Sequence, residues 1–257
     1  MAAGGRIEFL SPEGLRVDGR RPNELRSYRA QLAVIPQADG SALFSLGNTT
    51  VIATVYGPRD NNNHNSSNTE CSINTKIHAA AFSSTTGDRR KAGSSNTDRR
   101  LQDWSETVSH TISGVLLHDL FPRTSLDIFV EVLSADGAVL AASINAVSLA
   151  LVDAGVPMRD PVVALQGVII REHLLLDGNR LEERAGAPTT LAFTPRNGKI
   201  VGVMVDPKYP QHRFQDVCTM LQPHSESVFA HLDSEVIRPR LKHLYSMLKQ
   251  PTIKSHQ

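Results

Sequence analysis

A run of small and apolar residues, Ala138–Val152, constrains the fold of this chain more than any other stretch. The apolar segment Val130–Leu133 precedes it, and residues 135–137 form a turn between the two. A helix that is apolar on nearly all faces must be buried on nearly all faces. Gly155 and Pro157 follow at positions typical of a helix end. The sequence therefore predicts a central helix around which the other elements pack.

The turn before this helix is a candidate anion site. Backbone N–H groups at a helix N-terminus attract negative charge, and Gly137 allows a ligand to approach closely. The alternative is a core helix that begins after an ordinary turn. Whether the turn binds phosphate is the main functional question that the sequence raises.

Composition limits the possible functions. With 257 residues the chain can hold one large domain or two small ones, and its net charge of +1 means that any nucleic-acid affinity must come from local patches. No apolar run reaches the roughly 18–20 residues that span a bilayer, and the N-terminus lacks a signal-peptide core, so we expect no membrane association. Cys71 and Cys218 match no metal spacing, which predicts free thiols in a reducing compartment and no metal site.

The hydrophobic patterns predict an α+β fold: a mixed, mainly antiparallel sheet packed on two central helices, plus a C-terminal helix. A single domain is expected over residues 1–250, with residues 1–26 as an N-terminal arm and 251–257 as a disordered tail. Proline residues at 223 and 239 are expected to kink or break the last helix. Strands are predicted at 28–35, 41–46, 49–56, 71–82, 126–133, 161–170, 173–176, 190–194 and 199–205, and helices from Thr97 and over 211–248.

Two charged segments are candidate binding surfaces. The arm, Ser11–Arg26, contains four arginines and is predicted to be a solvated segment or, alternatively, a surface for RNA or an acidic partner. Residues 83–100 form either a solvated loop or a clamp for phosphodiesters, because arginine offers bidentate donors to phosphate oxygens. The basic residues of this second segment are Arg89, Arg90, Lys91, Arg99 and Arg100.

A third candidate is acidic. Asp177, Glu182 and Glu183 lie around a predicted turn. Such carboxylates could hold a divalent cation or act as an acid pair, or they could simply belong to an acidic surface turn.

Several stretches together resemble the RNase PH family, and within it the eukaryotic exosome core-ring subunits that are similar to the phosphorolytic subunit of the archaeal exosome. The matching stretches are RVDGRRPNELR at 16–26, SLGNTTVIATVYGPRD at 45–60, AAFSS at 80–84, FPRTSLDIFVEVLSADG at 121–137 and INAVSLALVDAGVPMRD at 144–160. The resemblance implies the RNase PH fold and a hexameric hetero-oligomeric ring of related subunits that threads single-stranded RNA. It also implies cap proteins with RNA-binding folds, an associated hydrolytic nuclease, and a location in nucleus, nucleolus and cytoplasm.

The resemblance also bears on the candidate sites. Active members cleave RNA from its 3′ end with inorganic phosphate, which a Gly-Ser-Arg-like sequence holds at the strand-to-helix turn; here those positions are Gly137, Ala138 and Val139. The family's paired aspartates correspond to Asp177 and Glu183. Losing the hydroxyl and the guanidinium removes contacts worth roughly 1.5–3 kcal/mol or more.

These observations favour a non-catalytic ring subunit without a cofactor, in which Asp177 and Glu183 are vestigial and Gly137, Ala138 and Val139 form a degenerate phosphate site. A rival hypothesis is a phosphate-dependent 3′–5′ exoribonuclease that uses inorganic phosphate and Mg²⁺ and releases nucleoside diphosphates, with a site that a neighbouring subunit completes. A free-standing homohexamer that trims tRNA is a third hypothesis, and it would need the same anion site.

Overall fold

The structure is a computed structural model that describes residues 9–11, 13–60, 71–83, 95–206 and 208–249. Nine strands in this part of the chain form two sheets, instead of the single sheet that we predicted. The first sheet has the order β1-β2-β3-β5-β4, and the second has the order β7-β6-β8-β9. Strand patterning shows which residues are extended, but not which strands pair, because pairing is decided by contacts between distant segments.

The first sheet is antiparallel except at one edge. It consists of β1 (Tyr28–Leu32), β2 (Gly40–Leu46), β3 (Thr49–Asp60), β5 (Thr124–Ser134) and β4 (Ser72–Ala79). β4 runs parallel to β5, because α1 lies between them in the chain and carries it across. The second sheet is wholly antiparallel and consists of β6 (Val163–Ile170), β7 (His173–Leu176), β8 (Ala187–Thr194) and β9 (Lys199–Val205).

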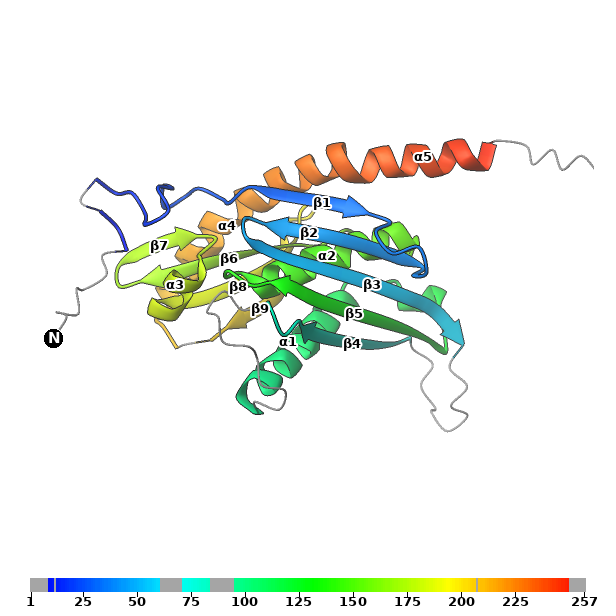
Figure 1. The fold of residues 1–257 in the computed structure, drawn as a ribbon, viewed down its shortest axis with the longest axis horizontal. Helices are drawn as coiled ribbons and strands as arrows, with labels where there is room; N and C mark the ends of the chain where they lie inside the picture. Colours follow the sequence, from blue (N-terminus) through cyan, green and yellow to red (C-terminus); the bar gives the residue numbers. More distant parts are fainter. Residues whose placement is uncertain (1–8, 12, 61–70, 84–94, 207, 250–257) are drawn as a thin grey trace, which may run out of the picture.

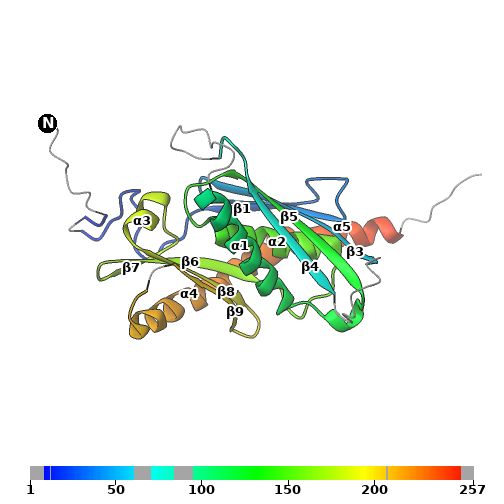
Figure 2. The ribbon, with the colours of Figure 1, turned by 90° about the horizontal axis from the view of Figure 1, so that it is seen from below.

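Helix α2 (Val139–Ala154) lies between the two sheets and packs on β2 and β3 on one side and on β6 on the other (Figures 1 and 2). Every residue from Val139 to Leu151 is buried, as the apolar run predicts. A Cβ on Gly40 would lie only 2.5 Å from the backbone nitrogen of Ala154, so the strand and helix backbones are in close contact. The helix ends at Gly155, whose φ of 71° is left-handed.

The remaining helices surround this core. They are α1 (Ser95–Ser113), α3 (Arg180–Ala185), α4 (Gln211–Leu232) and α5 (Arg238–Lys249), with a 3₁₀ turn at His118–Leu120 and a π-helical turn at Asp233–Ile237. α3 was not predicted. None of the described helices is long and apolar enough to cross a membrane.

We predicted that Pro223 would kink or break the C-terminal helix, and it does not break it. α4 continues through this proline, because buried residues on both sides of it, Leu221 and Val228, hold the two halves against the core. Proline in a helix interior removes one backbone hydrogen bond, but tertiary packing can outweigh that cost. Pro239 is the second residue of α5, which follows the π-helical turn directly.

Candidate functional site: the turn before the central helix

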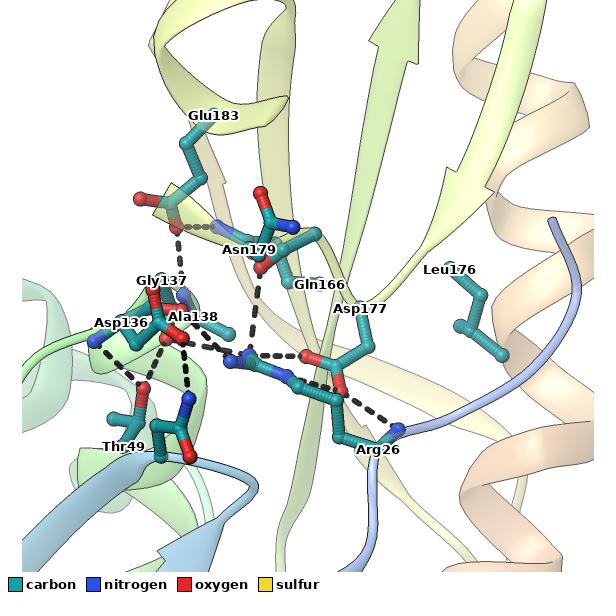
Figure 3. A network of polar contacts seen from close by, with 12 residues as sticks. Arg26, Thr49, Asp136, Gly137, Ala138, Gln166, Leu176, Asp177, Asn179 and Glu183 are labelled. Atoms are coloured by element: carbon teal, nitrogen blue, oxygen red, sulfur yellow. Dashed lines mark hydrogen bonds and ion pairs between the residues drawn. The ribbon is translucent and has the colours of Figure 1, made fainter. Parts of the chain in front are cut away.

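Two backbone turns meet at the N-terminus of α2. Gly137 has a φ of +88°, and a Cβ placed on it would lie 2.5 Å from the carbonyl oxygen of Gly178 and 2.8 Å from the carbonyl carbon of Asn179. Ala138 follows in the left-handed region, with a φ of 53°. The turn before α2 therefore packs directly against the segment that leads into α3 (Figure 3).

The carboxylate of Glu183 occupies the N-terminus of α2. Its Oε1 accepts a hydrogen bond from the backbone N–H of Ala138 at 2.6 Å and another from Nε2 of Gln166 at 2.7 Å. α2 has no side-chain cap of its own. Because a helix N-terminus carries a partial positive charge and unsatisfied N–H groups, this carboxylate stabilises α2 as a capping anion would.

The start of α3 positions Glu183. The side chain of Asn179 accepts from the backbone N–H of Glu182 at 3.0 Å, and Glu182 Oε2 accepts from the N–H of Asn179 at 2.9 Å. This reciprocal capping box begins α3 and places Glu183 in its first turn, facing the α2 turn. A short helix of six residues is fixed here by its cap and its ion pairs, which explains why periodicity did not predict it.

Asp177 is paired with Arg26 inside the protein. Both carboxylate oxygens accept from Arg26: Oδ1 from Nη2 at 2.6 Å, and Oδ2 from Nε at 2.8 Å and from the backbone N–H at 3.1 Å. The two side chains are only 2% and 8% exposed. Burial by itself would lower the pKa of Arg26, but its hydrogen bonds and charge interaction with Asp177 raise that pKa above its ordinary value.

Arg26 also holds the α2 turn in place. Its Nη1 donates to the carbonyl of Asp136 at 2.8 Å. From the other side, Thr49 Oγ1 donates to the carbonyl of Gly137 at 2.7 Å and accepts from the N–H of Asp136 at 3.0 Å. The turn is therefore fixed by side chains from the arm and from β3, as Figure 3 shows.

Most described residues of the N-terminal arm are exposed, as predicted, but Arg16 and Arg26 are buried. Arg16 forms a fully buried ion pair with Glu182, in which Nε lies 2.9 Å from Oε1, and it also donates to the carbonyl of Leu176 at 2.6 Å. Arg20 donates to the carbonyl of Asp177 at 3.1 Å. The arginines of the arm that lie deepest thus contact the chain's own acidic turn, whose residues are more than 150 positions away in the sequence.

Of the predicted basic residues, Arg89, Arg90 and Lys91 lie outside the described part of the chain. Arg99 and Arg100 are exposed on α1, which begins at Ser95 and not at Thr97, so they lie in its second turn. Arg100 pairs with Asp206 at 3.0 Å, and its guanidinium lies 4.9 Å from the centre of the Trp104 ring. Its position is therefore defined by two contacts.

The site in this form is unfavourable for the phosphate and divalent cation of the rival hypothesis. A phosphate at the α2 turn would meet the carboxylate of Glu183, and a cation at Asp177 would meet the guanidinium of Arg26. Like charges at such short range repel, and the repulsion is strongest at the buried Asp177. Within the described residues, no three His, Cys, Asp or Glu side chains form a group that could hold a metal ion.

Gln166 and Thr49 belong to this site but were not predicted from the sequence. Gln166 lies in a strand whose other residues are apolar and buried, and an amide in such a strand is a signal of a buried polar partner. Arg26 was noted only as part of the arm and of a family-like stretch. Its partner, Asp177, could not be inferred from spacing, because 151 positions separate the two residues.

Comparison with known proteins identifies the family. The model of the 3′ exoribonuclease family, domain 1 (RNase PH), matches residues 24–157. An exosome complex component RRP41 homolog from Arabidopsis thaliana is 39% identical over 241 residues, covering 93% of this chain and 98% of the relative. The human exosome complex component RRP41 is 36% identical over 239 residues, covering 92% and 96%.

Solved structures have the same fold. The crystal structure of rice Rrp46 aligns with a TM-score of 0.71 at 24% identity, covering 86% of this chain and 99% of that one. The Archaeoglobus fulgidus exosome with RNA bound to the active site aligns with a TM-score of 0.73 at 20% identity, covering 86% and 93%. Together with the family match, these similarities confirm the predicted RNase PH fold, and the chain belongs to the RNase PH family of 3′ exoribonucleases.

Proposed function

We propose that this chain is a non-catalytic subunit of an exosome core ring, where it supports the ring and guides single-stranded RNA toward a separate hydrolytic nuclease in 3′–5′ RNA processing and degradation. The ring would contain related RNase PH-like subunits and carry RNA-binding cap proteins. Support for the ring role comes from the relatives that are named exosome complex components and align over nearly their whole length.

One observation carries the non-catalytic part of the proposal. Where active relatives of the family hold inorganic phosphate, this chain places the Glu183 carboxylate, 2.6 Å from the N–H of Ala138. Residues 138 and 139 are alanine and valine, so neither supplies a hydroxyl or a positive charge to the turn. Phosphorolysis needs phosphate as the attacking group, and a turn already filled by an anion disfavours its binding.

The decisive experiment is an assay of the ring reconstituted with its partner subunits. Degradation of a labelled single-stranded RNA is followed with inorganic phosphate and, as the control, with sulfate at equal ionic strength. The proposal predicts no nucleoside diphosphate in either case. Nucleoside diphosphate that appears only with phosphate would overturn it in favour of the phosphorolytic alternative.

The RNA-guiding role is tested separately. Arg89, Arg90, Lys91, Arg99 and Arg100 are proposed to contact RNA phosphates, so threading by the assembled ring should weaken steeply as salt rises. Replacing Arg99 and Arg100 together by alanine should reduce the protection of RNA inside the ring. Unchanged protection in that double variant would contradict the proposed path.

A further inference from the structure

An open pocket of about 470 Å³ lies beside the α2 turn and is separate from it. Three arginines from two helices line it: Arg100 from α1, and Arg180 and Arg184 from α3. The other lining residues are Glu183, Gly186, Pro188 and Asp206. Its volume falls within the range of about 300–1,000 Å³ that is usual for ligand sites.

The pocket adjoins the closed turn because α3 begins against it. A Cβ on Gly137 would lie 2.9 Å from the backbone nitrogen of Arg180. Glu183 forms the boundary between the two, since it lines the pocket while its Oε1 caps α2. Residues 138–139 therefore carry no positive charge, but Arg180 and Arg184 on the neighbouring helix α3 do.

The two arginines of α3 differ in their effect on that helix. Arg180 and Arg184 are four residues apart, and like charges at this spacing slightly destabilise a helix. Arg180 is the first residue of α3, where a cation opposes the helix dipole, whereas Arg184 lies in the last turn, where a cation is favourable. The pair as a whole therefore does not stabilise the helix, and both side chains line the pocket.

Arg100 completes the pocket in a defined position. Its contacts with Asp206 and with the Trp104 ring hold the guanidinium at the pocket wall. Three guanidinium groups outnumber the two carboxylates in the lining, and Glu183 already accepts two hydrogen bonds elsewhere. Guanidinium groups match phosphate oxygens in pairs of hydrogen bonds, which favours a phosphate over other anions.

We propose that Arg100, Arg180 and Arg184 form a binding pocket for a backbone phosphate of single-stranded RNA, beside the α2 turn. This inference rests on the proposed function in so far as RNA is the ligand that the chain guides. It adds two RNA-binding residues, Arg180 and Arg184, that do not belong to the basic segment of residues 83–100.

The test measures binding of a fluorescently labelled oligouridylate to the full chain by anisotropy over a salt series. Arg184→Gln and the double variant with Arg180→Gln are compared with wild type. The matched control is Arg29→Gln, which removes the same charge from an exposed position on β1 of the other sheet. The double variant should bind about tenfold more weakly, and the slope of log K against log salt should fall by about 0.7 for each phosphate that is no longer neutralised.

The chain offers an internal reporter as well. Trp104 is its only tryptophan and lies under Arg100, so RNA that engages Arg100 should change the tryptophan fluorescence of wild type and of the Arg29→Gln control. This change should be reduced in Arg184→Gln, whose side chain is exposed and whose folding is not at risk.

Equal affinities and salt slopes for Arg184→Gln, the double variant and the control would overturn the proposal. A second outcome would also overturn it: inorganic phosphate changes the tryptophan fluorescence, while neither variant changes the affinity for RNA. The pocket would then bind free phosphate and not RNA. Phosphate-dependent nucleoside diphosphate release by the ring would refute only the non-catalytic function, since it does not depend on these two arginines.

Discussion

The family resemblance matches Asp177 to one of the paired aspartates of active relatives, so replacing it by asparagine is the obvious test of catalysis. In this chain, we predict that Asp177→Asn acts mainly on folding. The substitution removes the charge that faces Arg26 and turns one accepting oxygen into an NH₂ group that faces a donor. Arg26 would remain buried, with its hydrogen bond to the carbonyl of Asp136 at 2.8 Å but without its counter-charge.

The magnitude follows from burial and from the number of hydrogen bonds. Three hydrogen bonds join Arg26 to Asp177, and removing one partner of a buried ion pair costs about 3–5 kcal/mol. A domain is stable by only about 5–15 kcal/mol in total. For a chain of this size, that loss lowers the melting temperature by about 6–20 °C, at about 2–4 °C for each kcal/mol.

Urea unfolding, followed by circular dichroism, measures the effect. Asp177→Asn, Arg26→Met and the double variant form a cycle, and Asp18→Asn serves as a control because Asp18 is partly exposed and pairs with Arg20 near the surface. The double variant should lose less stability than the sum of the single variants, because it leaves no unpaired buried charge. The control should change stability by less than about 1 kcal/mol.

An Asp177→Asn variant that unfolds within about 0.5 kcal/mol of wild type would refute this reasoning, since a buried pair cannot lose one member so cheaply. If the predicted loss is found, missing activity in this variant cannot identify Asp177 as a catalytic acid. The assay of the ring with and without phosphate then remains the informative test of catalysis.

Three further predictions concern the same region and one outlying carboxylate. Glu183→Ala should lower the free energy of unfolding by about 1 kcal/mol, because α2 loses its cap. Phosphate, but not chloride at equal ionic strength, should restore part of the melting temperature of this variant and leave that of wild type unchanged. Equal responses of variant and wild type to phosphate would contradict the capping role. Gly137→Ala should lower the free energy of unfolding in urea by well over 3 kcal/mol, because its Cβ would collide with the backbone of the neighbouring turn. The control Gly155→Ala has the same left-handed strain but open space around it, and should lower that free energy by about 1 kcal/mol. Similar losses in the two variants would show that backbone conformation alone matters. Burial raises the pKa of Asp160, so the contribution of this residue to stability should fall as pH rises from the ordinary aspartate pKa through the raised value. The free energy of unfolding of wild type, measured relative to Asp160→Asn, should therefore fall over that pH range. A difference between the two proteins that is constant with pH would contradict this prediction.

The central helix and most strands could be predicted from the sequence because these elements depend on local pattern. The buried apolar run gives α2 almost residue for residue, and Gly155 ends it as expected. The strands predicted at 190–194 and 199–205 correspond to β8 and β9, although β8 begins earlier, at Ala187. Local periodicity and turn residues are sufficient for such elements.

The candidate site was less predictable, because its contacts join distant segments. Asp177 and Glu183 were predicted to share one acidic turn, but the structure gives them different partners: Arg26 for the first, and the Ala138 N–H for the second. The arm was predicted to be solvated, since four arginines with glycines resemble a surface segment. Buried arginines are recognisable only when their carboxylates are known, and those lie more than 150 residues away.

The family resemblance implies an aspartate where this chain has Glu183, and this difference connects these observations. The N-terminus of α2 needs an electron-rich partner whether or not the chain performs catalysis, because its N–H groups are otherwise unsatisfied. Phosphate meets that need in an active enzyme, but Ala138 and Val139 provide no positive charge to retain it. A side chain longer by one methylene reaches about 1 Å further, and here the Glu183 carboxylate reaches the N–H of Ala138 at 2.6 Å. Under the proposed non-catalytic function, the absence of phosphate ligands at residues 138–139 and the longer carboxylate at residue 183 are two parts of one change, which replaces an exchangeable anion by a covalently attached one.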